Sequence, residues 1–114
     1  MALNMEGGPG IGGRFSSLIY VNSSAQEYHK EPLFYIMGQI SKFLPPNSVR
    51  VGLELHSNLD KLYSTAFVRP DNQIVVIVFN MNDEEIELNI NDPKNGYLNS
   101  KIMAHSIQSY IWSN

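Results

Sequence analysis

The sequence contains no cysteine, which excludes disulfide bonds, thiolate metal sites and a cysteine nucleophile but leaves the redox compartment undetermined. Basic residues are also few, because eight Lys and Arg stand against eleven Asp and Glu, and the net charge is −3. The basic residues are scattered along the chain and form no stripe that could neutralise phosphates. Nucleic acid is therefore an unfavourable partner for this protein.

Long hydrophobic runs are missing as well. The longest, residues 74–79, is far shorter than a membrane span, and we expect no transmembrane segment. The first ten residues lack the basic and apolar regions of a signal peptide, so we expect none in this chain. What remains is an ordinary globular composition, 43% apolar and 17% charged, over 114 residues. This length favours one domain stabilised by one core.

One amphipathic helix is evident in the stretch KEPLFYIMGQISKFLPP. Pro32 suits a first helical turn, and Pro45 and Pro46 cannot continue a helix. Apolar side chains recur at steps of three and four residues, at Leu33, Ile36, Met37, Ile40, Phe43 and Leu44. This spacing predicts a helix over residues 31–44 with one apolar face.

After this helix the pattern changes to the alternation typical of strands. Strand patterns cover residues 49–55, 61–69, 73–80, 85–90 and 106–113, and residues 18–21 form a further short apolar run. Residues 70–72 predict a hairpin turn and residues 91–96 a loop. The segment 73–80 is apolar on both faces, as expected of a central strand. Five evenly spaced strands predict a mainly β protein with an antiparallel sandwich.

A glycine-rich stretch, GGPGIGG at residues 7–13, formally matches the dinucleotide-binding pattern G-x-G-x-x-G. That motif requires a buried strand before the glycines and a helix after them, whose N-terminus holds the pyrophosphate. Only seven residues precede Gly8, and the following RFSSLIYV has the pattern of a loop and a strand. We therefore interpret the stretch as a surface loop and expect no cofactor.

Other candidate sites are equally weak. His29, His56 and His105 are isolated in sequence and lack the spacing of a zinc pair, so no metal site is predicted. The acidic stretch NDEE at residues 82–85 is typical of a solvated turn, and no G-x-S-x-G motif is present. Asn22 begins the sequence Asn-Ser-Ser, a candidate glycosylation site if the chain is secreted. The residues alone identify no catalytic group.

Aromatic residues on the predicted strands leave two interpretations open. They could form a sugar-binding platform, although on alternating strands aromatics more often face the core. The residues concerned are Tyr63, Phe67, Phe79, Tyr97, Tyr110 and Trp112. A stand-alone β-sandwich module that binds carbohydrate or protein is therefore one functional hypothesis, and it predicts exposure of Tyr63, Tyr97 or Trp112.

Four stretches, taken in order, support a second hypothesis. ALNMEGGP, KEPLFYIMGQISKFLPPNSVRVGL, IVVIVFN and HSIQSYIW resemble the C-terminal part of the glucosylceramidases, acid β-glucosidases of glycoside hydrolase family 30. The resemblance covers essentially the whole chain. It implies that residues 1–46 are a remnant of a (β/α)8 barrel, comprising its last strand, a loop and its last helix. Residues 47–114 would be the C-terminal β-sandwich domain.

The resemblance also implies glycosidase chemistry, but the catalytic groups for that chemistry are absent from this chain. Family members are retaining glycosidases with two catalytic glutamates, and both lie upstream of the region matched here. Glu6 corresponds to a glutamate of the family that is not catalytic. The chain is therefore expected to be a C-terminal fragment or a truncated paralogue of such an enzyme, to contain no catalytic residue and to be inactive alone. The whole family enzyme would hydrolyse glucosylceramide, and its missing N-terminal part or another chain would complete the sandwich.

A sugar pocket of the family lies beside the loop that follows EGGP. The resemblance places Arg14 and Phe15 at its rim as candidate substrate-binding residues. The family has a tryptophan and then an Asn-Phe pair in this loop. Here the tryptophan is absent, Arg14 replaces the asparagine, and Phe15 alone fits. By the same resemblance the family location is the lysosome, although the sequence carries no signal peptide.

Overall fold

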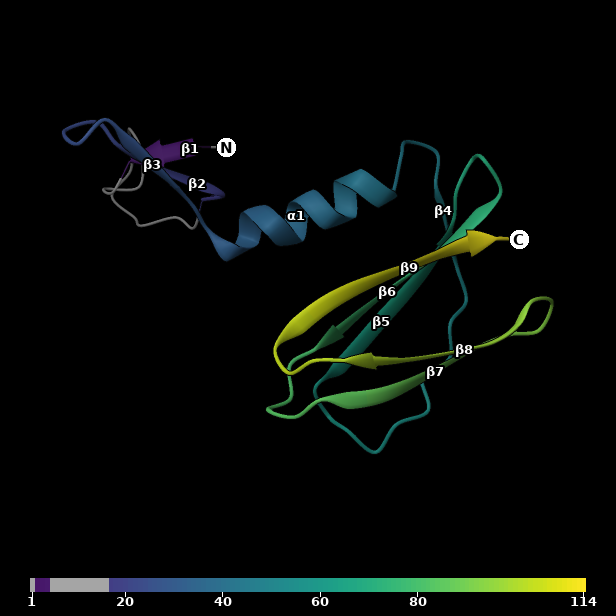
Figure 1. Cartoon of the computed structure of the whole chain (residues 1–114). Helices are drawn as coiled ribbons and strands as arrows, with labels where there is room; N and C mark the ends of the chain where they lie inside the picture. Colours follow the sequence, from purple (N-terminus) through teal and green to yellow (C-terminus); the bar gives the residue numbers. More distant parts are fainter. Residues whose placement is uncertain (1, 5–16) are drawn as a thin grey trace. The chain divides into compact units, whose positions relative to one another are not determined.

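A computed structural model describes residues 2–4 and 17–114 of the chain. The chain divides into two compact units, Met1–Lys42 and Phe43–Asn114 (Figure 1). It is mainly β with one helix, and its strands are mostly antiparallel, as the sequence predicted.

The first unit contains a small sheet with the strand order β1-β2-β3. Its strands are β1 (Ala2–Asn4), β2 (Ile19–Asn22) and β3 (Glu27–Lys30). β1 runs parallel to β2, and β2 and β3 form an antiparallel hairpin. The strand near residues 18–21 is confirmed, whereas β3 was not predicted. Its sequence EYHK is exposed throughout, so no inward apolar face marks it as a strand.

Helix α1 (Pro32–Phe43) confirms the predicted helix. Pro32 occupies its first position, where the missing N–H costs nothing. The N–H of Glu31 donates to the carbonyl of Leu18 over 3.0 Å, which fixes the start of the helix against β2. No residue of α1 is buried, and the exposed large side chains include Tyr35 and Met37.

The second unit contains a four-stranded antiparallel sheet and a separate hairpin (Figure 1). The sheet has the order β4-β5-β6-β9 and the hairpin pairs β7 with β8. Their bounds are Val49–Val51 for β4, Leu62–Val68 for β5, Gln73–Asn80 for β6, Ile86–Asp92 for β7, Gly96–Ile102 for β8 and Ser106–Ser113 for β9. β6 pairs with β5 on one side and β9 on the other, which confirms its prediction as the central strand.

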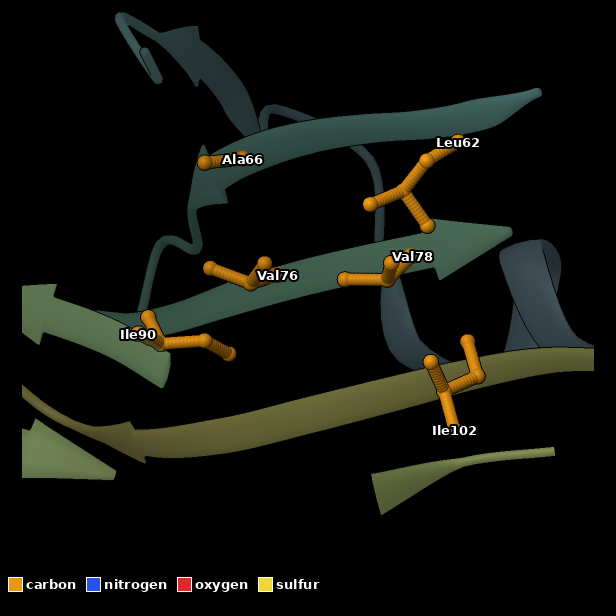
Figure 2. Packing of buried hydrophobic residues seen from close by; sticks show 6 residues of the cluster. All are labelled: Leu62, Ala66, Val76, Val78, Ile90 and Ile102. Atoms are coloured by element: carbon orange, nitrogen blue, oxygen red, sulfur yellow. The ribbon is translucent and has the colours of Figure 1, made fainter. Parts of the chain in front are cut away.

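The core of this unit lies between the sheet and the β7–β8 hairpin (Figure 2). Along β5 buried and exposed side chains alternate at the start, so Leu62 is buried while its neighbour Tyr63 is exposed, whereas β6 is buried on both faces from Val75 to Val78. The buried cluster consists of Leu62, Ala66, Val76, Val78, Ile90 and Ile102. Burial of these apolar side chains on two facing layers stabilises the unit by the hydrophobic effect.

Two predicted boundaries in this unit were wrong. The strand at 49–55 ends at Val51, and Leu53 and Leu55 are exposed, so alternation alone overestimated its length. The loop predicted at 91–96 is shorter, because β7 continues to Asp92 and β8 begins at Gly96. β8 itself was missed, since its sequence GYLNSKI is mostly polar and only Ile102 is fully buried.

Candidate functional site

The predicted sugar-pocket residues Arg14 and Phe15 lie outside the described residues, as does the glycine stretch 7–13. The description resumes at Ser17, which is buried and whose hydroxyl donates to the carbonyl of Ile19 over 3.0 Å. The third candidate, Asn22, lies at the end of β2 and is half-buried. Its Oδ1 accepts a hydrogen bond from the backbone N–H of Ala25 over 3.2 Å.

An open groove of about 480 Å³ lies on the β2–β3 hairpin beside Asn22. Its apolar lining comes from Ile19, Val21 and Tyr28, and Val21 is paired directly with Tyr28 across the hairpin. Its remaining lining residues are Asn22, Ser23, Gln26 and Glu27. Tyr28 is 65% exposed and Val21 40% exposed, which leaves an apolar surface next to a polar turn.

The three histidines do not converge on a metal-binding site. Each lies near one carboxylate: His29 is 3.9 Å from Glu27, His56 is 3.6 Å from Glu54 and His105 is 2.8 Å from Asp83. All six side chains are exposed. Within residues 2–4 and 17–114, no group of three His, Asp or Glu side chains is placed to hold a metal ion.

The acidic turn between β6 and β7 is solvated, as predicted. Asp83, Glu84 and Glu85 are exposed, Asp83 lies within hydrogen-bond distance of the His105 ring, and Glu85 forms an ion pair with Lys101. Glu85 lies 3.0 Å from Lys101, and this hydrogen bond and charge raise the pKa of the Lys101 ammonium. The carboxylates of Asp83 and Glu85 thus connect the turn to β8 and to the β8–β9 turn instead of forming a catalytic pair.

Asn80 is a buried polar residue that the sequence did not reveal as important. Its side chain is 0% exposed. Its Nδ2 donates to the carbonyls of Glu84, Ile102 and Met103 over 2.8, 3.3 and 3.0 Å. Its Oδ1 accepts from the backbone and side-chain nitrogens of Asn82 over 2.9 and 3.0 Å. Asn80 therefore joins the end of β6 to the acidic turn and to the end of β8.

The strand aromatics divide between surface and core. Tyr63 is 56% exposed and Tyr97 is 72% exposed, on strands of different sheets. Trp112 packs against the core, and its Nε1 donates to Asp92 Oδ2 over 2.6 Å. Hydrogen bonds from Asn95, Trp112 and the backbone of Lys94 lower the pKa of Asp92 to about 2. Exposure is thus confirmed for two of the three aromatics expected of a binding module.

None of the described helical residues forms a segment long and apolar enough to cross a membrane.

Comparison with known families identifies a relationship for the second unit. Residues 47–110 match the model of the glycosyl hydrolase family 30 beta sandwich domain. Over 113 residues, or 98% of this chain, the sequence is 40% identical to lysosomal acid glucosylceramidase of Mus musculus and covers 22% of that protein. It is 35% identical over 82 residues to putative glucosylceramidase 4 of Caenorhabditis elegans, covering 71% of this chain and 16% of that protein. The chain thus spans about a fifth of the length of these relatives.

Solved structures show a similar fold. The crystal structure of SrfJ from Salmonella typhimurium matches 99% of this chain with a TM-score of 0.84 and 20% identity, and the chain covers 25% of it. The endo-beta1,6-glucanase BT3312 matches 99% of this chain with a TM-score of 0.81 and 20% identity, and the chain covers 26% of it. At this identity the likeness concerns the fold.

Proposed function

Because the chain belongs to glycosyl hydrolase family 30, we propose that it is the C-terminal part of a glucosylceramidase-like retaining β-glucosidase. The observation that carries this proposal is the 40% identity to a lysosomal acid glucosylceramidase over 98% of the chain. The substrate of the whole enzyme would be glucosylceramide, cleaved to glucose and ceramide, and its location the lysosome. Residues 1–46 would contribute to the barrel and residues 47–114 to the sandwich.

The chain alone is proposed to have no hydrolytic activity. A retaining mechanism requires two carboxyl groups about 5 Å apart, one as acid/base and one as nucleophile. The family resemblance puts both upstream of the matched region. The carboxylates at the acidic turn are engaged by His105 and Lys101, and Asp92, with its low pKa, is a poor general acid near neutral pH.

A hydrolysis assay tests the inactivity of the isolated chain. The purified 114-residue chain is mixed with a fluorogenic β-glucoside at mildly acidic pH, and no release of fluorophore above buffer is expected. Turnover that a covalent glucosidase inhibitor abolishes would contradict the proposal.

A chimaera tests the positive part of the proposal. The chain replaces the matching C-terminal region of mouse lysosomal acid glucosylceramidase, and β-glucosidase activity of the chimaera is measured. We expect activity above that of the mouse enzyme truncated before this region. A control chimaera carries an unrelated β-sandwich in the same place. Equal activity of the two chimaeras would remove the support for a specific role.

We further propose Arg14 and Phe15 as residues at the rim of the sugar pocket. In the chimaera, Phe15→Ala is expected to lower kcat/KM for the β-glucoside about tenfold, because an aromatic contact to substrate is lost. Arg14→Asn introduces the residue of the family and is expected to raise kcat/KM. An unchanged kcat/KM in both variants would exclude these residues from the pocket.

Completion of the sandwich is a separate proposal. In the described sheet, β9 lies at one end of the strand order, and an edge strand presents unpaired N–H and C=O groups that can pair with a further strand. We propose that the remainder of the whole enzyme, or another chain, supplies them. Size-exclusion chromatography of the isolated chain should then show self-association that is absent from the chimaera; a strictly monomeric chain would argue against an unsatisfied edge.

The alternative of a stand-alone binding module is supported by the exposure of Tyr63 and Tyr97. Because the two residues lie on different sheets, they do not belong to one strand surface. Calorimetric titration of the isolated chain with gluco-oligosaccharides distinguishes the proposals. Saturable binding that Tyr97→Ala abolishes would favour the module, and no heat of binding would favour the enzyme fragment.

A further inference from the structure

One glycosylation motif occurs in the whole sequence. Asn22-Ser23-Ser24 is the only Asn-x-Ser/Thr triplet among the 114 residues, and its middle residue is not proline. Asn22 is the last residue of β2, and the turn that leads to β3 begins directly after it. Residues 23–26 of this turn are all exposed. The motif therefore lies where a bulky sugar can project into solvent.

The carboxamide of Asn22 is divided between two roles. Its Oδ1 accepts the hydrogen bond from Ala25 N–H and so stabilises the turn. For Nδ2, the atom to which a glycan would attach, the described part of the chain shows no hydrogen bond. N-glycosylation retains the carbonyl oxygen of the amide. The turn can therefore keep its hydrogen bond when Nδ2 is modified.

The apolar groove of Ile19, Val21 and Tyr28 includes Asn22 in its lining. A sugar attached to Asn22 would thus be held next to exposed apolar side chains. Covering part of this surface with the C–H groups of a sugar ring removes apolar area from water, which is favourable. The tether supplies a high local concentration of the sugar at the groove.

We propose that Asn22 carries an N-linked glycan and that its first N-acetylglucosamine lies on the groove formed by Ile19, Val21 and Tyr28. In the transfer, Asn22 Nδ2 forms a bond to C1 of an N-acetylglucosamine held by a lipid diphosphate. The C1–O bond to the diphosphate breaks, the lipid diphosphate leaves with the bonding electron pair, and Nδ2 loses one proton to a base. The inference rests on the proposed function only for the secretory route.

The attachment test supplies that route independently of the function. The full chain is secreted from cultured eukaryotic cells behind a cleavable signal peptide, with a mannosidase inhibitor so that the glycans remain sensitive to endoglycosidase H. Intact mass and a gel shift on enzyme treatment report the glycan. We expect it on the unaltered chain and on Ser23→Ala, and its loss in Asn22→Gln and Ser24→Ala.

Ser23→Ala is the matched control, because Ser23 and Ser24 are both exposed serines of the same turn. The glycosylation motif requires a serine or threonine at position 24 but accepts alanine at position 23. Transfer precedes folding, so mass analysis of the cell extract remains decisive if a variant folds poorly. An unmodified chain, or a glycan that persists in Asn22→Gln, would overturn the attachment. The measurement does not depend on β-glucosidase activity. A failure of the glycan attachment can therefore be distinguished from a failure of the proposed function.

The groove test compares chains trimmed to one N-acetylglucosamine with the unglycosylated Ser24→Ala variant. We expect the β2 and β3 amides to exchange hydrogen about three- to tenfold more slowly in the trimmed chain, because local opening exposes the groove. The same pair is then measured with Tyr28→Ala added. Loss of the difference supports seating on Tyr28. No slowing in the first pair, or equal slowing with Tyr28→Ala, would overturn it.

Discussion

The two units of this chain differ in where their apolar side chains lie. Among the described residues, every buried hydrophobic side chain belongs to the second unit, and the one buried residue of the first is Ser17. The first unit nevertheless contains an amphipathic helix whose Leu33, Met37 and Ile40 are exposed. The second unit covers one face of its sheet with its own hairpin, whereas α1 has an apolar face without a buried residue.

This difference shows that patterning and burial are separate properties. The apolar periodicity of a helix or strand indicates which face is suited to burial. That face is buried only when another element packs against it. The contrast agrees with the proposal that residues 1–46 are part of a (β/α)8 barrel. A complete barrel of this type has about 250 residues, so most of its elements would lie outside this segment.

Loss of side-chain volume in the core of the second unit should have the largest effect. Ile102 is 0% exposed, so Ile102→Ala is expected to lower the free energy of unfolding by about 2–5 kcal/mol. The adjacent Met103 is 63% exposed, and Met103→Ala serves as the control with an effect of about 0.5 kcal/mol or less. Urea denaturation measures both. Equal effects would show that the cluster in Figure 2 is not the stabilising core.

Removal of the buried amide of Asn80 should come next. Asn80→Ala leaves three carbonyls without this donor and is expected to cost about 1–3 kcal/mol of unfolding free energy. Asn91 is an exposed asparagine of β7, so Asn91→Ala is the matched control and should be nearly neutral. Thermal unfolding of the two variants gives the comparison. A stable Asn80→Ala protein would mean that water replaces the hydrogen bonds of the side chain.

The hydrogen-bonded carboxylate of Asp92 should contribute a smaller, pH-dependent effect. Its pKa is about 2 in the folded chain and 3.8 ordinarily, so its contribution is present above about pH 4 and is lost as the pH falls toward 2. Asp92→Asn should lower stability at pH 7 and remove this part of the acid dependence.

Trp112 is the chain's single tryptophan, so its fluorescence reports the Asp92 contact directly. The emission maximum of the unaltered chain should change between pH 4 and pH 2 before global unfolding, and Asp92→Asn should show no such step. A step of equal size in the variant would assign the titration to another group.

The exposed face of α1 should give the smallest effect in the isolated chain. Met37 is 49% exposed, so Met37→Gln is expected to change the free energy of unfolding by no more than about 0.5 kcal/mol. In the chimaera with the mouse enzyme, the same substitution should cost more, because a barrel would cover the helix. Urea denaturation of both proteins checks this, and equal effects would contradict a covered helix in the whole enzyme.

Local patterns predicted most elements, but not their partners. The helix at Pro32–Phe43 and the central strand Gln73–Asn80 followed from their periodicities and punctuating residues. β3 and β8 were missed, since both are mostly polar and form strands through backbone pairing with β2 and β7. Alternation of apolar residues was thus an incomplete guide to strand formation.

The candidate site divides in the same way. Asn22 could be selected from its triplet alone, whereas the groove beside it required the pairing of β2 with β3. Asn80 and the Asp92–Trp112 contact had no sequence signal, because the residues they join are up to 23 positions apart. Arg14 and Phe15 remain predictions from the family resemblance.

Local sequence patterns were enough to predict the helix with its prolines and most of the alternating strands, and composition and resemblance were enough to exclude thiol chemistry and to identify the family. The covered faces, the five hydrogen bonds of the Asn80 side chain and the low pKa of Asp92 depend instead on the three-dimensional packing. The physical reason is that periodicity depends on neighbours within a few positions. Burial, buried hydrogen bonding and pKa depend on groups brought together from distant parts of the chain.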